Sequence, residues 1–369
     1  MIEENKRKKI CIAINRLAHA GAERVAASWA NYLAKQGHEV FVLVWFCSED
    51  TYDLDARVHV VPVAETEEAY CQLSNTNLIF NTRKIIGLER PDIVISFLPK
   101  MQIRTMLATL GMRIKRVETV RNNPWIDKDV AGKRSLWNMC FHRSDAIVVQ
   151  TKEQSLYFPK RLQKKTVVIS NPISGDFVNR QKVYNGEGIR RFVSVARINQ
   201  QKNYPMMIRA FARVAEKEPS CQLDIYGAGT PEATQELQEL IKQLGMEQNI
   251  NLCGWKKNIS EMLTSYDAFL MSSNYEGMPN ALAEAMAVGL VCLSTDCKTG
   301  PKDMIDHGVN GYLATTGNEE SFFEGIWKIV QMEQHQCVEM GATAREKILN
   351  MCSEENTLVR LKQLIESDI

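Results

Sequence analysis

Short apolar runs alternate with longer stretches of helical periodicity through most of the chain. The first half contains the runs ICIAIN, HEVFVLVWF, VHVVPV, PDIVISFLP, RVETVR, DAIVVQT and TVVIS. Continuous apolar strands separated by helical crossovers are typical of a parallel sheet that is covered on both faces. The pattern therefore predicts a doubly wound α/β sheet in the first half.

The stretch from Ala22 to Gln36 predicts the first helix of this sheet. Within it Val25, Trp29 and Leu33 recur at i, i+4 and i+8, so their side chains share one helix face. Gly37 follows as the expected C-cap. We expect the apolar face of this helix to pack on the sheet.

A second alternation fills the other half of the chain, after the polar segment GDFVNRQKVYNGEGIR. Its runs are RFVSVARI, QLDIYGAG, INLCGW, DAFLMSS, LVCLSTD and GYLA. We therefore expect two Rossmann-like domains, at residues 1–172 and 187–350, joined by the polar segment. Residues 351–369 predict a final helix that packs back on either domain. Doubly wound sheets bind ligands at the carboxyl ends of their strands, so two facing sheets would form a ligand-binding cleft.

The overall charge excludes little, but its distribution is uneven. The chain of 369 residues carries 45 basic and 44 acidic side chains, so its net charge of +1 gives no support to nucleic-acid binding. From Lys100 to Lys165, however, fifteen basic and five acidic residues give a net charge of +10. This segment predicts a surface for anionic lipid, a funnel for an anionic substrate, or an ordinary solvated basic surface.

The apolar runs and the cysteines indicate a cytoplasmic protein. Every apolar run is shorter than the roughly 18 to 20 residues that cross a bilayer, and the N-terminal MIEENKRKK adjoins no long hydrophobic region. Ten cysteines occur without a C-x-x-C pair, and we expect them to form neither disulfides nor a zinc site. Cys11, Cys221, Cys253 and Cys292 belong to apolar runs, where we expect buried thiols.

A dense group of motifs lies in the second half: VARINQQKN, IYGAGT, NYEGMPNALAEAMAVGL and STDCKTGPKDMIDHGVNGYL. In this order and spacing they resemble the nucleotide-sugar-dependent glycosyltransferases of family 4, which have the GT-B fold. In the first half AHAGAERVAASWANYLAKQGHEV, VRNNP and DAIVVQTKEQ are similar to segments of the bacterial members. The resemblance covers nearly the whole chain, and the string E-G-M-P-N-A-L-x-E-A-M-A-x-G is its most specific part.

The resemblance implies a donor site in the second domain. Arg197 and Lys202 follow the first strand of that domain, where fixed cations can stabilise a departing diphosphate. Glu276 precedes a helix and is expected near the transferred sugar, whereas Glu284 lies inside the helix and can accept from the ribose hydroxyls. Catalytic roles are expected for Glu276, Arg197 and Lys202. Donor binding is expected for these three, for Glu284, and for Gly21, Gly227, Gly277, Met278, Pro279 and Asn280.

The first domain is expected to bind the acceptor, through Arg121 and Asn122. Some relatives have a histidine near this position, where this chain has none. His19, beside the Ala20–Gly21 loop, is a weaker candidate. Two D-x-D strings, Asp53 with Asp55 and Asp127 with Asp129, do not follow strands of the second domain. We therefore expect no cofactor and no metal in the chemical step.

The resemblance implies a retaining glycosyltransferase. We expect it to move a hexose or N-acetylhexosamine from a nucleotide-diphosphate sugar, with a UDP-sugar favoured, to a saccharide or a polyprenyl-diphosphate-linked saccharide during cell-surface polysaccharide synthesis. Such an acceptor fits a cytoplasmic enzyme with peripheral contact to an anionic membrane and no nucleic-acid partner. The alternatives are a nucleotide-sugar epimerase of the same broad fold and a non-catalytic nucleotide-sugar-binding module.

Overall fold

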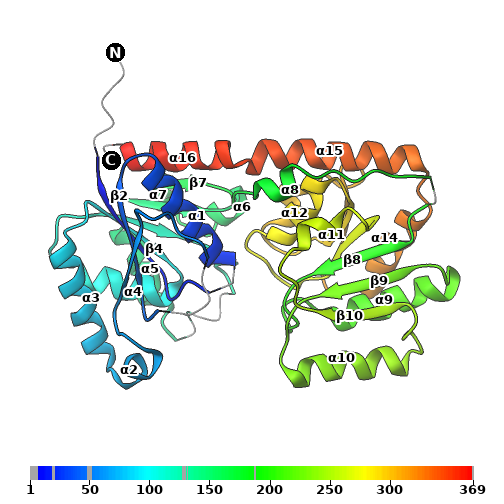
Figure 1. Cartoon of the computed structure of the whole chain (residues 1–369), viewed down its shortest axis with the longest axis horizontal. Helices are drawn as coiled ribbons and strands as arrows, with labels where there is room; N and C mark the ends of the chain where they lie inside the picture. Colours follow the sequence, from blue (N-terminus) through cyan, green and yellow to red (C-terminus); the bar gives the residue numbers. More distant parts are fainter. Residues whose placement is uncertain are drawn as a thin grey trace, which may run out of the picture. The chain divides into compact units, whose positions relative to one another are not determined.

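The computed structural model describes residues 7–18, 21–47, 52–126, 130, 132–186 and 188–367. The chain divides into two compact units, one formed by residues 1–172 with 355–369 and the other by residues 173–354. Figure 1 shows a parallel sheet flanked by helices in each unit, which is the predicted α/β architecture.

The first unit contains a seven-stranded sheet in the order β3-β2-β1-β4-β5-β6-β7, with every paired strand parallel. Its strands are β1 (Lys9–Ala13), β2 (Glu39–Val44), β3 (His59–Pro62), β4 (Ile93–Phe97), β5 (Lys115–Thr119), β6 (Ala146–Val149) and β7 (Thr166–Val168). Its helices are α1 (Gly21–Lys35), α2 (Glu67–Gln72), α3 (Asn75–Glu89), α4 (Pro99–Ala108), α5 (Arg134–Arg143), α6 (Lys152–Ser155), α7 (Lys160–Gln163) and α16 (Glu354–Glu366). Each apolar run of the first half forms one of these strands.

Side chains alternate between the two faces of this sheet. In β1, Ile10 and Ile12 join the core beneath α1, whereas Cys11 and Ala13 join the core that contains Met101 of α4. This alternation is the period of two of a strand buried on both faces. Trp29 of α1 is fully buried, so the predicted apolar face of that helix does pack on the sheet.

The second unit contains a six-stranded sheet in the order β10-β9-β8-β11-β12-β13, again with parallel pairs. Its strands are β8 (Arg191–Val195), β9 (Gln222–Tyr226), β10 (Ile250–Gly254), β11 (Ala268–Met271), β12 (Val291–Thr295) and β13 (Tyr312–Ala314). Its helices are α8 (Gly175–Val178), α9 (Tyr204–Lys217), α10 (Pro231–Gln243), α11 (Ile259–Leu263), α12 (Asn280–Val288), α13 (Pro301–Met304), α14 (Glu319–Val330) and α15 (Gln334–Cys352).

The segment that we expected to be a linker starts inside the second unit. Phe177 of α8 is buried in the core beneath α12, and Arg345 of α15 donates to the carbonyl oxygens of Val178 and Arg180. Lys182 forms an ion pair with Asp267 at 2.8 Å. These polar anchors attach a sequence of loop-like composition to the sheet, so the unit begins at residue 173 rather than at 187.

The last helix, α16, belongs to the first unit. Leu358, Leu361 and Leu364 share one side of it and are buried in the same core as α1. The chain thus returns to its first sheet after completing the second, and α16 packs on the first unit.

One cysteine prediction was wrong. Cys11, Cys221 and Cys292 are buried, whereas Cys253 of β10 is exposed. The reason is that β10 is an edge strand of the second sheet, so its end lacks the cover that central strands receive.

Candidate active site

The predicted donor residues lie at the carboxyl edge of the second sheet, where its strand order reverses. β8 and β11 are neighbours in the sheet although three helices and two strands separate them in sequence. The loop after β8 carries Arg197 and Lys202, and the loop after β11 carries Glu276. Such a switch point is where doubly wound sheets bind their ligands.

Lys202 and Glu276 are in direct contact across this point. The Lys202 Nζ lies 2.6 Å from Glu276 Oε1, and their side chains are only 17% and 7% exposed. Ser273 Oγ donates to the same oxygen at 2.6 Å, and Gln201 Nε2 lies 3.4 Å from Glu276 Oε2. A buried carboxylate is costly without such partners, so these contacts stabilise Glu276 in the site.

Backbone contacts hold the two loops together. Asn274 N donates to the carbonyl oxygen of Gln201 at 2.8 Å, and Gln201 Nε2 donates to that of Tyr275 at 2.8 Å. Thr299, in the loop after β12, donates to the carbonyl oxygen of Glu276. The Glu276 side chain is therefore positioned by three loops, and little rearrangement is needed to present it to a ligand.

α12 begins where the sequence predicted a helix. Pro279 is its N-cap and Asn280 is its first residue. Glu284 is the fifth of the nine residues of the helix and is 7% exposed, between buried Ala283 and Ala285. The pair of glutamates thus flanks a helix start whose N–H groups can receive phosphate or sugar oxygens.

Two glycines allow close approach of the loops at this edge. At Gly300 (φ +92°) a Cβ would lie 2.8 Å from the carbonyl oxygen of Gly277 and 2.7 Å from Cδ of Pro279. At Gly227 (φ +158°) a Cβ would lie 1.8 Å from the carbonyl oxygen of Ala196. Packing therefore explains Gly227 on its own, and a donor contact at this residue stays a prediction.

Arg197 lies exposed on the loop that carries Lys202. The structure thus brings Lys202 and Glu276 into contact and places Arg197 on the same loop. It places Glu284 on the helix that follows Glu276. Gly277 and Met278 are buried in the loop that leads into α12.

In the first unit, Arg121 occupies an aromatic cage at the carboxyl end of β5. Its guanidinium lies 4.5 Å from the ring centre of Trp29 and 4.8 Å from that of Phe97. Nη1 donates to Asn171 Oδ1 at 3.2 Å, whereas Nε and Nη2 are buried and have no hydrogen-bond partner within the described part of the chain. Burial lowers the pKa of Arg121 to about 9, which still leaves it protonated at neutral pH. Two donor nitrogens are therefore available for an anion or a sugar hydroxyl.

The other first-unit candidates differ from Arg121. Asn122 Oδ1 accepts from the backbone N of Asn123 at 2.8 Å, so this side chain stabilises its own turn. Gly21 is the exposed first residue of α1, whose N-terminus it helps to form. His19 and Ala20 lie outside the described residues.

The remaining polar motifs give no metal centre in the described ranges. Asp55 forms a bidentate pair with Arg57, at 2.8 Å for both contacts, and Asp127 and Asp129 lie outside the described residues. Searching the residues that the structure covers finds no group of three or more His, Cys, Asp or Glu side chains placed to hold a metal. Over the same residues, none of the helices has the length and apolarity to cross a membrane.

Sequence reasoning missed three residues that hold Glu276: Gln201, Ser273 and Thr299. Ser273 precedes Glu276 by three residues, a spacing that lets a loop fold back on itself. Gln201 and Thr299 lie in motifs that the resemblance uses, beside Lys202 and before Gly300. Their position within these motifs could have identified Gln201 and Thr299 as candidate site residues.

Comparison with known proteins assigns both halves of the chain. A family model described as "Glycosyl transferases group 1" matches residues 177–347, and one described as "Glycosyltransferase Family 4" matches residues 19–177. An uncharacterized glycosyltransferase of Methanocaldococcus jannaschii is 32% identical over a segment that covers 60% of each chain.

Two further relatives extend over more of the chain. A Campylobacter jejuni α-1,4-N-acetyl-D-galactosaminyltransferase, named for a PP-undecaprenol-linked acceptor, is 25% identical and covers 84% of this chain and 86% of its own. The crystal structure of Anabaena HepE in complex with UDP and glucose has a TM-score of 0.80 at 16% identity, with 98% and 100% of the two chains covered. That likeness establishes the fold. The two family models, which together match residues 19–347, show that the chain belongs to the family 4 glycosyltransferases, which have the GT-B fold.

Proposed function

We propose that this glycosyltransferase moves a hexose or N-acetylhexosamine, with retention of configuration, from a nucleotide-diphosphate sugar, of which a UDP-sugar is the favoured donor. Its acceptor is a saccharide or a polyprenyl-diphosphate-linked saccharide in the synthesis of a cell-surface polysaccharide. The observation that carries the proposal is the contact of Lys202, Glu276 and Ser273 at the switch point of the second sheet.

In this proposal the second unit binds the donor. Arg197 and Lys202 interact with the diphosphate, because a planar guanidinium and a point-charge ammonium both suit phosphate oxygens. Glu276 accepts from hydroxyls of the sugar, and Glu284 accepts from those of the ribose. The start of α12 adds backbone N–H groups for the same ligand. The HepE complex with UDP and glucose supports a donor of this class.

The reaction breaks the bond between the anomeric carbon and the diphosphate oxygen and forms one to the acceptor oxygen. The acceptor hydroxyl approaches on the face that the diphosphate leaves, and its proton passes to the departing phosphate oxygen. Lys202 and Arg197 stabilise the charge that develops on the leaving group, so fixed cations perform the role for which other enzymes use a metal. Glu276 orients the donor, because two donors already engage its Oε1.

The first unit binds the acceptor, through Arg121 in its aromatic cage. The name of the Campylobacter jejuni relative, with its PP-undecaprenol-linked acceptor, supports a lipid-linked saccharide. The basic segment from Lys100 to Lys165 suits such an anionic acceptor and peripheral contact of a cytoplasmic enzyme with an anionic membrane.

A thermal-shift panel of nucleotide sugars, followed by NMR of the product, tests the proposal. A donor that binds the folded state raises Tm, and the rank order of shifts identifies it. We expect a UDP-sugar to give the largest shift, and transfer to an acceptor to give an anomeric carbon of unchanged configuration. Isomerisation of the donor without acceptor would instead indicate an epimerase. Binding without turnover of any acceptor would indicate a non-catalytic module.

A further inference from the structure

A second pocket lies in the first unit, at the carboxyl edge of its sheet. Its volume is about 500 Å³, within the range of small-molecule sites. It is lined by Trp45, which directly follows β2, and by side chains of α2, α3, α4 and α5 with the residue before α5. None of the predicted donor or acceptor residues lines it.

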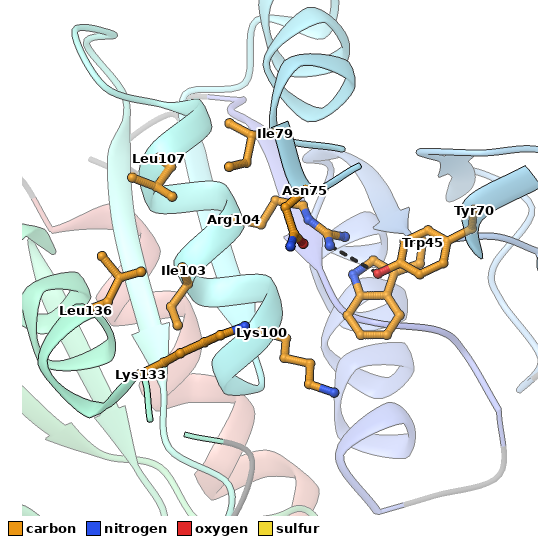
Figure 2. Close-up of a pocket in the computed structure, with 10 residues that line it drawn as sticks. All are labelled: Trp45, Tyr70, Asn75, Ile79, Lys100, Ile103, Arg104, Leu107, Lys133 and Leu136. Carbon is orange, nitrogen blue, oxygen red and sulfur yellow. Dashed lines mark hydrogen bonds between the residues drawn. The ribbon is translucent and has the colours of Figure 1, made fainter. Parts of the chain in front are cut away.

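Arg104 of α4 is the buried cation of this pocket. Arg104 is only 7% exposed, and its Nη2 donates a hydrogen bond to Tyr70 Oη at 3.0 Å. The guanidinium lies 5.3 Å from the ring centre of Trp45 and 5.4 Å from that of Tyr70, and these two rings stack on each other. Figure 2 shows Arg104 beside both rings, with its hydrogen bond to Tyr70 dashed.

Two donors at this point have no hydrogen-bond partner. Arg104 Nη1 and Trp45 Nε1 are both buried, and neither donates a hydrogen bond to any polar atom that the structure describes. Leaving a buried donor unpaired costs about 1–3 kcal/mol, and more when the group is charged. An acceptor atom that a ligand brings to the pocket would relieve this cost.

The charge around Arg104 favours an anion. Lys100 and Lys133 are exposed and also line the pocket, and its described lining includes no carboxylate. Asn75, the first residue of the 15-residue helix α3, also lines the pocket, so the positive end of that helix dipole lies beside it.

The opposite wall is apolar. It is formed by Ile79 of α3, Ile103 and Leu107 of α4 and Leu136 of α5. In Figure 2, Ile103, Leu107 and Leu136 lie across the pocket from Trp45 and Tyr70. An anion alone would gain nothing from this wall, whereas an attached hydrocarbon chain would bury it.

The surface of α3 continues the apolar character. Phe80 is 65% exposed and Leu88 is 73% exposed, at i and i+8 with the exposed Lys84 between them at i+4. An apolar chain that leaves the pocket along α3 would therefore meet side chains that favour a lipid environment.

We propose that this pocket binds the phosphoryl group and the adjoining isoprenoid units of a lipid-linked acceptor. Arg104, Trp45 and the two lysines hold the phosphate oxygens, and the wall of Ile79, Ile103, Leu107 and Leu136 contacts the hydrocarbon chain. The inference rests on the proposed function, because it assigns the lipid part of the acceptor to a place in the first unit. It goes further in naming an anchor separate from Arg121.

Binding of three probes to the full chain by isothermal titration tests the inference. We expect farnesyl diphosphate to bind at least about tenfold more tightly than inorganic pyrophosphate, and farnesol to bind more weakly than either. Equal affinities for farnesyl diphosphate and pyrophosphate would show a site for free phosphate and would overturn the assignment to a lipid. The same follows if farnesol binds as tightly as farnesyl diphosphate.

Substitutions locate the binding. Arg104→Met is expected to weaken farnesyl diphosphate binding at least about tenfold. The double variant Lys100→Met with Lys133→Met changes only exposed side chains, so it tests the charge even if Arg104→Met fails to fold. We expect the double variant to weaken binding by a similar factor. Arg113→Met is the matched control, because Arg113 is exposed in the same basic segment but does not line the pocket.

Donor binding separates this inference from the proposed function. In the double variant the thermal shift with a nucleotide sugar should equal that of the wild type, and transfer to a soluble saccharide should persist while transfer to a lipid-linked one falls. Unchanged farnesyl diphosphate binding in the double variant would refute the pocket and leave the proposed function intact. If the wild type binds none of the nucleotide sugars in the panel, the proposed function itself is refuted.

Discussion

Buried cations in the two units have different partners. In the second unit Lys202 has an acidic partner at 2.6 Å, and Ser273 completes the hydrogen bonds of that partner. In the first unit Arg104 and Arg121 lie against aromatic rings, and each leaves buried donor nitrogens unpaired among the described residues. The Lys202 cation is thus paired within the protein, whereas Arg104 and Arg121 retain donor nitrogens that a ligand could engage.

The difference has a physical consequence. A ligand of the second unit must compete with Glu276 for Lys202. Each contact with Lys202 therefore adds less affinity, and a ligand that cannot replace the Glu276 carboxylate is disfavoured. A ligand of the first unit gains the full value of charge-assisted hydrogen bonds that the protein has left open. The contrast fits the proposed function, in which the second unit recognises the reacting sugar and the first unit captures an anionic acceptor.

The largest expected effect follows from removing the acidic partner. Glu276→Gln keeps the size of the side chain but loses the charge that faces Lys202 and the donor sugar. We expect kcat to fall by about 10²–10³-fold, with a far smaller change in affinity for the nucleoside diphosphate. Initial rates with labelled donor measure this. A variant within a factor of three of the wild type would remove Glu276 from the reaction.

The next effect is on stability, and it tests the contrast between paired and unpaired cations. Lys202→Met leaves Glu276 buried without its ion pair, which should cost about 2–3 kcal/mol and lower Tm by several degrees. Arg209→Met is the control, because it breaks an exposed pair with Glu319 at 2.9 Å and should cost under about 1 kcal/mol. If the two variants lose the same free energy of unfolding, burial does not make the Lys202–Glu276 pair more important for stability than an exposed pair.

A smaller effect is expected from Arg121→Met in the first unit. Methionine can fill the cage formed by Trp29 and Phe97, and no ion pair is broken, so Tm should change little. The KM for the acceptor should rise by about tenfold, while nucleotide-sugar binding stays as in the wild type. If instead donor affinity fell and acceptor KM did not, Arg121 would belong to the donor site.

The smallest effect concerns pH and a buried acid of the first unit. Glu118 of β5 is 1% exposed, and burial raises the pKa of its carboxyl well above 4.5, although Arg116 and Lys165 lower it. Below pH 4.5 the folded and unfolded chains both hold this proton. As pH rises, the unfolded chain releases it first, so stability falls until the pKa of the folded state is passed.

Glu118→Gln lacks this titration. The Tm of the variant relative to the wild type should therefore increase as the buffer is changed from about pH 5 to about pH 8. Differential scanning calorimetry at several pH values measures the difference. A constant difference across that range would show that Glu118 has the same proton affinity in the folded and unfolded chains.

The strands and the second-unit site were predictable for a clear reason. All the apolar runs became strands, because a parallel sheet covered on both faces needs side chains such as Ile10 and Cys11 to be apolar on each. Glu276 and Lys202 could be placed because they follow neighbouring strands of the sheet within a specific motif. Local sequence therefore held most of the information about that edge.

The first-unit pocket could not be predicted in the same way. Trp45 follows β2, Tyr70 lies on α2 and Arg104 on α4. They form no motif, so only the folded chain brings them together. The burial of residues 173–186 against α12 and α15 depends on contacts such as that of Arg345 with Val178, which a polar sequence does not reveal. The burial of Cys253 was predicted wrongly because the local sequence indicates that a segment is a strand but not whether that strand lies at the edge of the sheet.

Affinity for a nucleoside diphosphate in the Arg197→Met variant tests the central claim most directly. Arg197 is exposed, so its replacement should leave the fold intact, and Lys242→Met on α10 is an exposed control away from the site. Titration of the wild type and both variants with the diphosphate of the best donor, expected to be UDP, gives the three Kd values. The account predicts at least about tenfold weaker binding for Arg197→Met and an unchanged Kd for Lys242→Met. An unchanged Kd for Arg197→Met would contradict it.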